Sequence, residues 1–232
     1  MAWRKLPASP RQVRAAVRWF RKRVAVTPEQ WKELEHDAKL QAFTLSGTTQ
    51  LSVVQTALDE MAKAILKGED LDAYKARLRK KLKDDFADKN SGRLKTAFQT
   101  QTQTALNVGR WYELEDTPGK PFRRYDAVLD HKTTVLCRSL DGTVVRADNP
   151  MLLLRWPPLH FNCRMQVRAI ASRTARRHGV VEQLPLHQLP MAGFGYAPPM
   201  RAHFELERHK FDGGALAVYD KKQLKRPKPT PA

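Results

Sequence analysis

The spacing of the apolar residues changes near Pro118-Gly119, and this change most constrains the fold. Before it, apolar side chains recur every three or four residues, as they do in amphipathic helices. After it, short apolar runs alternate with polar residues and turns, as they do in strands. The sequence therefore predicts an α+β protein with a helical N-terminal region, 1–116, and a small β-rich module, 117–172.

Local end signals mark the helices of the N-terminal region. Apolar residues from Val13 to Val24 share one face of the first predicted helix. The run Thr27-Pro28-Glu29-Gln30 matches a capping box and begins a second helix. Gly68 is expected to end a third helix and Asp70 to cap a fourth. The residues expected to be buried in the second helix are Trp31, Leu34 and Ala38.

A fifth helix is expected from about Arg93 to Pro118, and it carries an unusual polar stretch from Gln99 to Thr104. Amide and hydroxyl groups in a protein interior are nearly always hydrogen-bonded. These side chains therefore need partners elsewhere in the fold if this helix is buried.

The last part of the chain, 173–232, is rich in proline and basic residues and shows little periodicity. This composition favours an extended segment that lies against a neighbour. We therefore expect a basic, proline-rich, extended C-terminal tail.

Positive charge is spread along the chain, because 42 Lys+Arg against 24 Asp+Glu give a formal net charge of +18. Such a balance favours a polyanionic partner, and contact with phosphates needs no reading of bases. We therefore expect non-specific binding of double-stranded DNA. The candidate contact residues are Arg14, Arg18, Arg21, Lys22, Arg173, Arg176, Arg177, Lys221, Lys222, Lys225 and Arg226.

No apolar run is long enough to cross a membrane, and the first residues lead into charge rather than into an apolar stretch. Two cysteines, Cys137 and Cys163, do not make a disulfide framework. We therefore expect a protein that is made in a cytoplasm, keeps reduced thiols and has no membrane partner.

Two cysteines and two histidines in the β-rich module form a candidate metal site. Zinc prefers thiolate sulfur and imidazole nitrogen, and the spacing His160-x-x-Cys163 lets one turn present two donors. The candidate ligands are His131, Cys137, His160 and Cys163. The alternative is a set of packed side chains, which the lack of a Cys-x-x-Cys pair favours. We therefore expect no cofactor, with zinc as the one candidate.

An enzymatic alternative is a metal-dependent HNH-like nuclease, because Asp130-His131, Asn149 and His160 occur in the order of such a site. The last histidine of that site lies on a helix, whereas His160 follows Pro157-Pro158. A Gly-rich phosphate loop and a nucleophile elbow are also missing. We therefore expect a protein that is not an enzyme.

The β-rich module carries a fixed order of motifs: Asp130-His131, then Leu140-Asp141-Gly142, then the run from Trp156 to Arg164 with its Pro-Pro and Cys-Arg pairs. Thr100 to Ala105 and Gly109-Arg110 precede them on a predicted helix. Over about residues 10–172 this arrangement resembles the phage Mu F-like head morphogenesis proteins, also called minor head or minor capsid proteins. The family usually reads Cys-Arg-Cys, so Met165 replaces one candidate donor here.

The resemblance implies a structural protein in the head of a tailed bacteriophage or prophage, present in few copies at or near the portal. Its implied partners are the portal protein, other head or scaffold proteins and packaged DNA. Its implied location is the virion, after assembly in the host cytoplasm. A general nucleic-acid-binding protein unrelated to virions is a further alternative.

Overall fold

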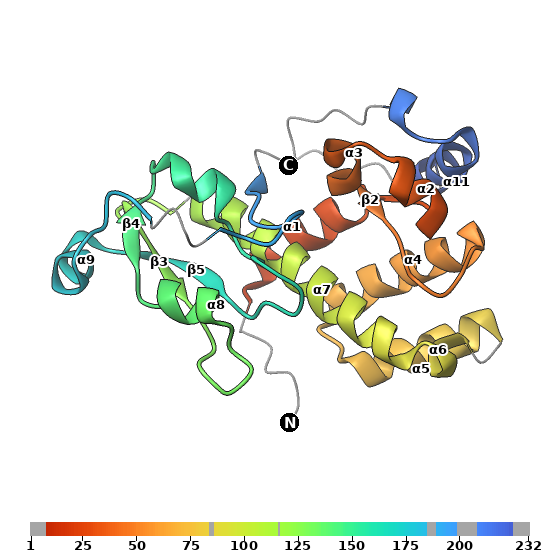
Figure 1. Cartoon of the computed structure of the whole chain (residues 1–232), viewed down its shortest axis with the longest axis horizontal. Helices are drawn as coiled ribbons and strands as arrows, with labels where there is room; N and C mark the ends of the chain where they lie inside the picture. The colour runs from red at the N-terminus through yellow and green to blue at the C-terminus, as the bar shows by residue number, and fades with distance from the viewer. Residues whose placement is uncertain (1–7, 84–85, 116, 185–188, 199–207, 225–232) are drawn as a thin grey trace. The chain divides into compact units, whose positions relative to one another are not determined.

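The computed structural model describes residues 8–83, 86–115, 117–184, 189–198 and 208–224, with the side chains of 37 and 222–224 excepted. The chain forms two compact units, Met1–Phe20 with Thr96–His203 and Arg21–Lys95 with Phe204–Ala232 (Figure 1). Helices are most abundant, and one small antiparallel sheet accompanies them, which confirms the α+β class. None of the described helices is long and apolar enough to span a bilayer. The expected region boundaries at 116 and 172 stay predictions.

The unit containing Arg21–Lys95 is mainly helical. Its elements are β1 (Val24–Ala25), α2 (Pro28–Glu33), α3 (His36–Gln41), β2 (Ala42–Phe43), α4 (Leu51–Lys67), α5 (Leu71–Leu82), α6 (Phe86–Lys89), η2 (Arg208–Lys210) and α11 (Gly213–Leu224). The predicted end signals are confirmed: Thr27 and Gln30 form the capping box, Gly68 ends α4 with a φ of 69°, and the Ala73 N–H donates to Asp70 at 2.9 Å.

Two expectations for the first helices were wrong. The first helix, α1 (Pro10–Phe20), ends before Val24, because Val24 pairs in parallel with Ala42 as part of a short ladder. The second helix breaks at Leu34, whose ψ of 144° is extended, so α2 and α3 are separate. Trp31 is 36% exposed rather than buried, and the Lys39 ammonium lies 4.8 Å from the centre of its ring.

The expected tail is not extended throughout. It contains helix α9 (Ser172–His178) as well as η2 and α11. Phe211 and Ala215 are buried in one apolar cluster with Val24, and Leu184 is buried in the core of the other unit. A few apolar side chains can therefore join an existing core without any periodic pattern of their own.

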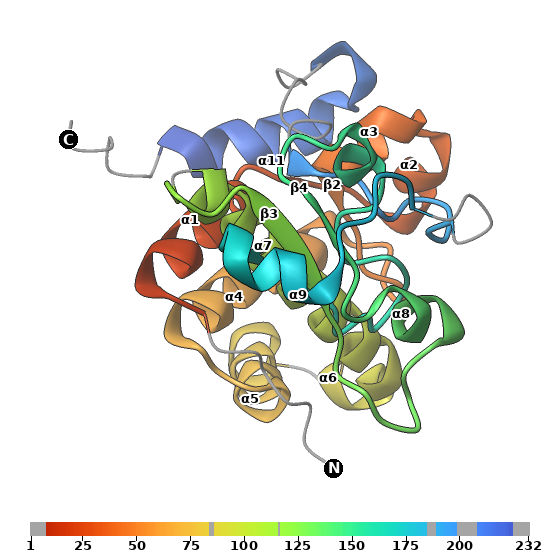
Figure 2. The ribbon, with the colours of Figure 1, turned by 90° about the vertical axis from the view of Figure 1, so that its left-hand side faces the viewer.

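The unit containing Thr96–His203 holds the β-rich part. Its sheet has the order β4 (Val144–Arg146), β3 (Phe122–Asp126), β5 (Gln166–Ile170), and both pairings are antiparallel. Other elements are α1, most of α7 (Ser91–Glu115), α8 (Val135–Leu140), η1 (Pro150–Leu154) and α9, which faces the viewer in Figure 2. The short helix α8 was not expected from the sequence.

The polar residues of α7 find main-chain partners in this unit. The side-chain amides of Gln103 and Asn107 both donate to the Met165 carbonyl, at 2.8 and 3.1 Å. The Thr100 hydroxyl accepts from the Asn162 N–H at 3.1 Å. The expectation is confirmed for Thr100 and Gln103, whose partners lie in the loop that leads into β5, whereas the buried Thr102 hydroxyl has no hydrogen-bond partner among the described residues.

Candidate functional site

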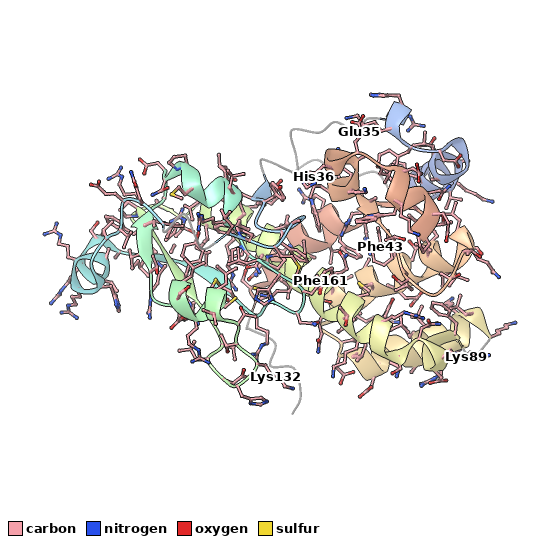
Figure 3. All side chains as sticks on the ribbon, in the orientation of Figure 1. Glu35, His36, Phe43, Lys89, Lys132 and Phe161 are labelled. Atoms are coloured by element: carbon pink, nitrogen blue, oxygen red, sulfur yellow. The ribbon has the colours of Figure 1, made fainter. Side chains whose placement is uncertain are left out.

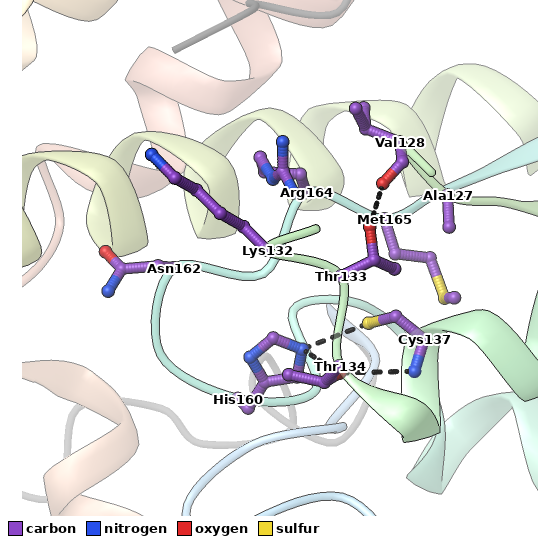
Figure 4. A pocket seen from close by; sticks show the side chains of 10 residues that line it. All are labelled: Ala127, Val128, Lys132, Thr133, Thr134, Cys137, His160, Asn162, Arg164 and Met165. Atoms are coloured by element: carbon purple, nitrogen blue, oxygen red, sulfur yellow. Dashed lines mark hydrogen bonds between the residues drawn. The ribbon is translucent and has the colours of Figure 1, made fainter. Parts of the chain in front are cut away.

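Helix α8 and the loop from Pro157 to Arg164 bring two thiols and one imidazole together, and Figure 4 shows two of these side chains, Cys137 and His160, facing each other. Cys137 lies on α8, and its N–H donates to the Thr134 hydroxyl that caps this helix, at 3.3 Å. His160 and Cys163 lie on one turn of the loop, which the Cys163 N–H closes by donating to the His160 carbonyl at 3.3 Å. The spacing His160-x-x-Cys163 therefore places both side chains on one turn.

The donor atoms of this cluster are close together. The two Sγ atoms of Cys137 and Cys163 are 3.7 Å apart, and His160 Nε2 is 3.0 Å from Cys137 Sγ. All three donor atoms lie within 4.8 Å of one another. Both cysteines are buried, whereas His160 is half-buried beside a small open pocket of about 10 Å³.

The tautomer of His160 follows from its partner. His160 Nδ1 is 2.7 Å from the carbonyl oxygen of Phe161, and a carbonyl oxygen can only accept. Nδ1 therefore carries the proton and donates it to this bond. The other nitrogen, Nε2, faces Cys137 Sγ and the Thr134 hydroxyl, each at 3.0 Å.

The contacts within the cluster change the acidity of its groups. The hydrogen bond from the Cys137 thiol, together with His160, holds the pKa of Cys163 well below its ordinary value despite burial. The same thiol pair and burial raise the pKa of Cys137. Hydrogen bonding to Cys163 also raises the pKa of His160, because the thiolate stabilises the imidazolium. Cys163 is therefore the thiol that ionises first.

An ion pair between Arg164 and Asp130 holds the C-terminal end of the loop from Pro157 to Arg164. The guanidinium of Arg164 donates to both carboxylate oxygens of Asp130, at 2.6 and 2.5 Å. This contact lowers the pKa of Asp130, and the Lys132 N–H, which donates to the same carboxylate, adds to the effect. Arg164 thus connects the loop to the segment between β3 and α8.

The structure brings three of the four predicted zinc ligands together. Cys137, His160 and Cys163 form the only such group of three or more His, Cys, Asp and Glu side chains among the described residues. His131 is not part of this group, and it is exposed on the loop between β3 and α8. Figure 3 shows its neighbour, Lys132, at the tip of this loop.

The four candidate nuclease residues have separate environments. Asn149 caps η1, accepting from the Met151 N–H at 2.9 Å, and its amide donates to the Glu182 carbonyl at 2.8 Å. Both oxygens of Asp130 are bonded to Arg164. In the described part of the chain, no hydrogen bond joins any two of Asp130, His131, Asn149 and His160.

The predicted DNA-contacting residues fall on several elements. Arg21 is half-buried. The exposed residues are Arg14 and Arg18 on α1, Lys22 just after α1, the three arginines of α9 (Arg173, Arg176 and Arg177), and Lys221 on α11. Lys225, Arg226 and the side chain of Lys222 lie outside the described residues. The arginines of α9 stand around the buried Ala175, which anchors this helix. Their role in DNA binding stays a prediction.

The residues that support the cluster were not expected from the sequence. These are the cap residue Thr134 and the ion-pair partner Arg164. A threonine three residues before Cys137 is a local N-cap signal that was available in the sequence. The pairing of Arg164 with Asp130 joins positions 34 residues apart, so local spacing could not show it.

Comparisons with known proteins find one family and two relatives that match the part of the chain that carries the cluster. A family model described as Phage Mu protein F like protein matches residues 55–168, a range that includes all three clustered donors. The Mu-like prophage FluMu F protein of Haemophilus influenzae is 28% identical over 164 residues, with 65% of this chain and 40% of that protein covered.

Protein F of Escherichia phage Mu, which is named as a putative capsid assembly protein, is 26% identical over 183 residues, with 71% of this chain and 42% of that protein covered. This chain therefore spans about two fifths of the length of these curated relatives. No solved structure matches it. The family model and both relatives show that residues 55–168 form a region of the phage Mu F-like protein family.

Proposed function

We propose that this chain acts in head assembly of a tailed bacteriophage or prophage, as a minor head protein present in few copies at or near the portal. The observation that carries this proposal is the match of residues 55–168 to the Mu F-like family, together with a relative named for capsid assembly. The matched residues include most of α4, all of α5 to α7 and most of the three-stranded sheet. The portal protein and other head or scaffold proteins are the proposed partners.

The proposed role is structural rather than catalytic. Asp130, the one carboxylate among the nuclease candidates, has both oxygens engaged by Arg164, and Asn149 caps a helix. A nuclease needs its metal ligands and its general base to converge on one phosphate. These side chains have local structural partners instead, so we do not propose a nuclease.

We further propose that the protein contacts packaged DNA without sequence preference. The formal charge of +18 supports this, and the arginines of α9 supply a compact set of exposed cations. Arg173, Arg176 and Arg177 have no ion-pair or hydrogen-bond partner among the described residues. Cations of this kind remain available for phosphate oxygens.

The DNA contact is tested by titrating duplexes of unrelated sequence at several salt concentrations. Affinity should be equal for all sequences, and the slope of log K against log salt should contain about −0.9 for each phosphate contact. Replacing Arg173, Arg176 and Arg177 by Gln should make the slope less steep. The matched control replaces Lys80, Lys81 and Lys95, which are also exposed, and removes the same charge.

Equal changes of slope for the two triple variants would show that α9 is no specific contact surface. Salt-insensitive binding, or strong preference for one sequence, would overturn DNA contact by this mechanism.

The assembly role is tested in particles of the phage or prophage that encodes the chain. Mass spectrometry of purified heads should find the protein at a low ratio to the major capsid protein, and crosslinking should join it to the portal. Deleting its gene should reduce the yield of filled heads. A protein that binds DNA but is absent from particles would instead support the general nucleic-acid-binding alternative.

A further inference from the structure

We propose that Cys137, His160 and Cys163 bind one Zn²⁺ ion through the two Sγ atoms and Nε2, with a water molecule as the fourth ligand. Nothing in the proposed assembly role requires this site, so it stands on its own geometry. Thiolate sulfur and imidazole nitrogen are a donor set that favours zinc over the hard cations magnesium and calcium.

The distances between the donor atoms fit a tetrahedral ion. Zn–S bonds of about 2.3 Å at tetrahedral angles place two sulfurs about 3.8 Å apart, and a Zn–N bond of about 2.0 Å places nitrogen about 3.5 Å from each sulfur. The Sγ atoms of Cys137 and Cys163 are 3.7 Å apart. His160 Nε2 is 3.0 Å from Cys137 Sγ and within 4.8 Å of Cys163 Sγ, so the ring needs to shift away from Cys137 and toward Cys163 to bind an ion between them.

His160 already has the orientation of a metal ligand. Zinc-bound histidines nearly always donate their second ring N–H to a carbonyl or carboxylate, which fixes the ring and its tautomer. His160 Nδ1 makes this bond to the Phe161 carbonyl at 2.7 Å. The lone pair of Nε2 faces Cys137 Sγ and the Thr134 hydroxyl (Figure 4), and a metal ion bound beside Cys137 would take the place of these contacts.

The charges of the surroundings also suit the ion. Two thiolates neutralise Zn²⁺, so the buried site as a whole carries no net charge, which avoids the large cost of burying an unpaired ion. The nearest arginine of the loop, Arg164, is already neutralised by Asp130. It therefore adds no uncompensated positive charge beside the cation.

A small pocket lined by two of the donors, Cys137 and His160, offers room for the fourth ligand. This pocket is lined by Thr134, Lys132 and Asn162, among others, and its volume of about 10 Å³ is close to what one water molecule needs. The exposed His131 is not within the group of donors, so it is not proposed as the fourth ligand. Three protein ligands and one open position distinguish this site from a closed structural zinc site, in which cysteines and histidines supply all four ligands.

The ion would hold the loop from Pro157 to Arg164 against helix α8. His160 and Cys163 are on the loop, whereas Cys137 is on the helix, so one ion joins both. Because metal ligands converge only in the folded state, binding free energy adds to the stability of the fold. Zinc binding at this site therefore stabilises the β-rich part of the chain.

The test measures zinc in the full chain, purified and kept under reducing conditions. One zinc per chain is expected, with a melting temperature that falls when a chelator removes the ion and recovers when Zn²⁺ is returned. Substituting Co²⁺ should give the intense visible bands of a tetrahedral site and a thiolate-to-cobalt charge-transfer band. A chain that takes up no zinc, or only iron or copper, overturns the proposal.

Variants identify the ligands. Cys137→Ser, Cys163→Ser and His160→Gln should each weaken zinc binding by more than about 100-fold, since loss of a mere supporting contact already costs 10- to 100-fold. The matched control is His131→Gln, which should bind zinc as the unchanged protein does. A loss in the control equal to that of the others overturns the three-ligand set.

Two further outcomes keep the proposal testable if a variant fails to fold. The cobalt spectrum of the unchanged chain alone reports whether thiolates coordinate the metal, and bands without thiolate character overturn the proposal. Mass spectrometry after the reducing preparation shows whether Cys137 and Cys163 have lost two hydrogens. A disulfide in place of bound zinc also overturns it.

Discussion

The helix pair α4 and α5 and the loop from Pro157 to Met165 are held together in different ways. The helix pair buries Leu58, Met61, Tyr74 and Leu78 almost completely, and these residues follow helical spacing. The loop has little regular structure, and polar contacts from α7, α8 and the Asp130 segment hold it. Stability in the first region therefore comes from periodic apolar packing, whereas position in the second comes from a few directed bonds.

Because of this difference, substitutions should affect the two regions in different ways. In the helix pair, the most sensitive polar position is the one that apolar packing has buried. In the loop, several polar groups hold the chain together, so single substitutions there should cost less free energy but should move the donor atoms. Substitutions in each region test this contrast.

The largest effect is expected for Glu60→Ala in the helix pair. Glu60 is 2% exposed, and its carboxylate accepts from Lys63 at 2.6 Å and from Arg77 at 2.8 Å. Removing it leaves Arg77 half-buried without this partner, which should lower the free energy of unfolding by about 2–4 kcal/mol. Denaturant unfolding measures the loss. Asp88→Ala, which breaks the exposed pair with Arg79, is the control and should change little.

The same residue predicts a pH dependence. Burial raises the pKa of Glu60, but hydrogen bonds from Lys63 and Arg77 outweigh it and hold the pKa below its ordinary value. Stability from this carboxylate is therefore complete above the ordinary pKa of about 4.3 and is lost as the pH falls through the lowered value. Glu60→Gln should remove this acid-side decrease. An unchanged acid limb would contradict the assignment.

A second prediction concerns the contact between α1 and α7, which belongs to the same unit as the loop. A Cβ atom on Gly109 would lie 2.1 Å from the Gln12 carbonyl oxygen, which is too close for any side chain. Gly109→Ala should therefore displace α1 and cost about 1–3 kcal/mol. Gly92→Ala is the matched control in the same helix, because no atom lies within 4 Å of its added Cβ. In thermal unfolding, the melting temperature should fall for Gly109→Ala and rise for Gly92→Ala.

A third prediction concerns the shared carbonyl of Met165. Asn107→Ala removes one of its two amide donors and should cost about 1–2 kcal/mol, since Gln103 still donates at 2.8 Å. Combining it with Gln103→Ala should cost more than the sum of the single losses, because the carbonyl is then buried without either donor. A double-mutant cycle measures this coupling, and strict additivity would contradict it.

Much of the helical part follows from local sequence signals. The capping box at Thr27, the Gly68 end and the Asp70 cap are each decided within four residues, so the sequence predicts them correctly. Tertiary packing overrides local pattern where α1 ends early, because Val24 pairs with Ala42, which is far along the chain. The tail shows the same effect, since Phe211 and Ala215 are buried by a core made elsewhere.

All three clustered residues were among those expected from the sequence, but the limits of the cluster were not predictable. The residue types indicated zinc, and His160-x-x-Cys163 indicated one turn. Spacing cannot decide whether a loop histidine points inward, so His131 entered the predicted ligand set although the structure leaves it exposed. Cys137 and Cys163 are 26 residues apart, and only the fold of α8 against the loop brings their sulfurs together.

The smallest effect on stability is expected for Asp130→Asn at the end of the loop. Hydrogen bonds from Arg164 lower the pKa of Asp130, so its contribution is complete above the ordinary aspartate pKa of about 3.9 and is lost as the pH falls through the lowered value. Because this pair is partly exposed, melting should change little at neutral pH. The bond nevertheless positions Arg164 beside Cys163, so amide hydrogen exchange of residues 161–165 should become faster. Asp148→Asn, which breaks the exposed pair with Arg146, is the control and should leave that exchange unchanged. Equal exchange in the two variants would show that the loop is positioned by α7 and the cysteines alone.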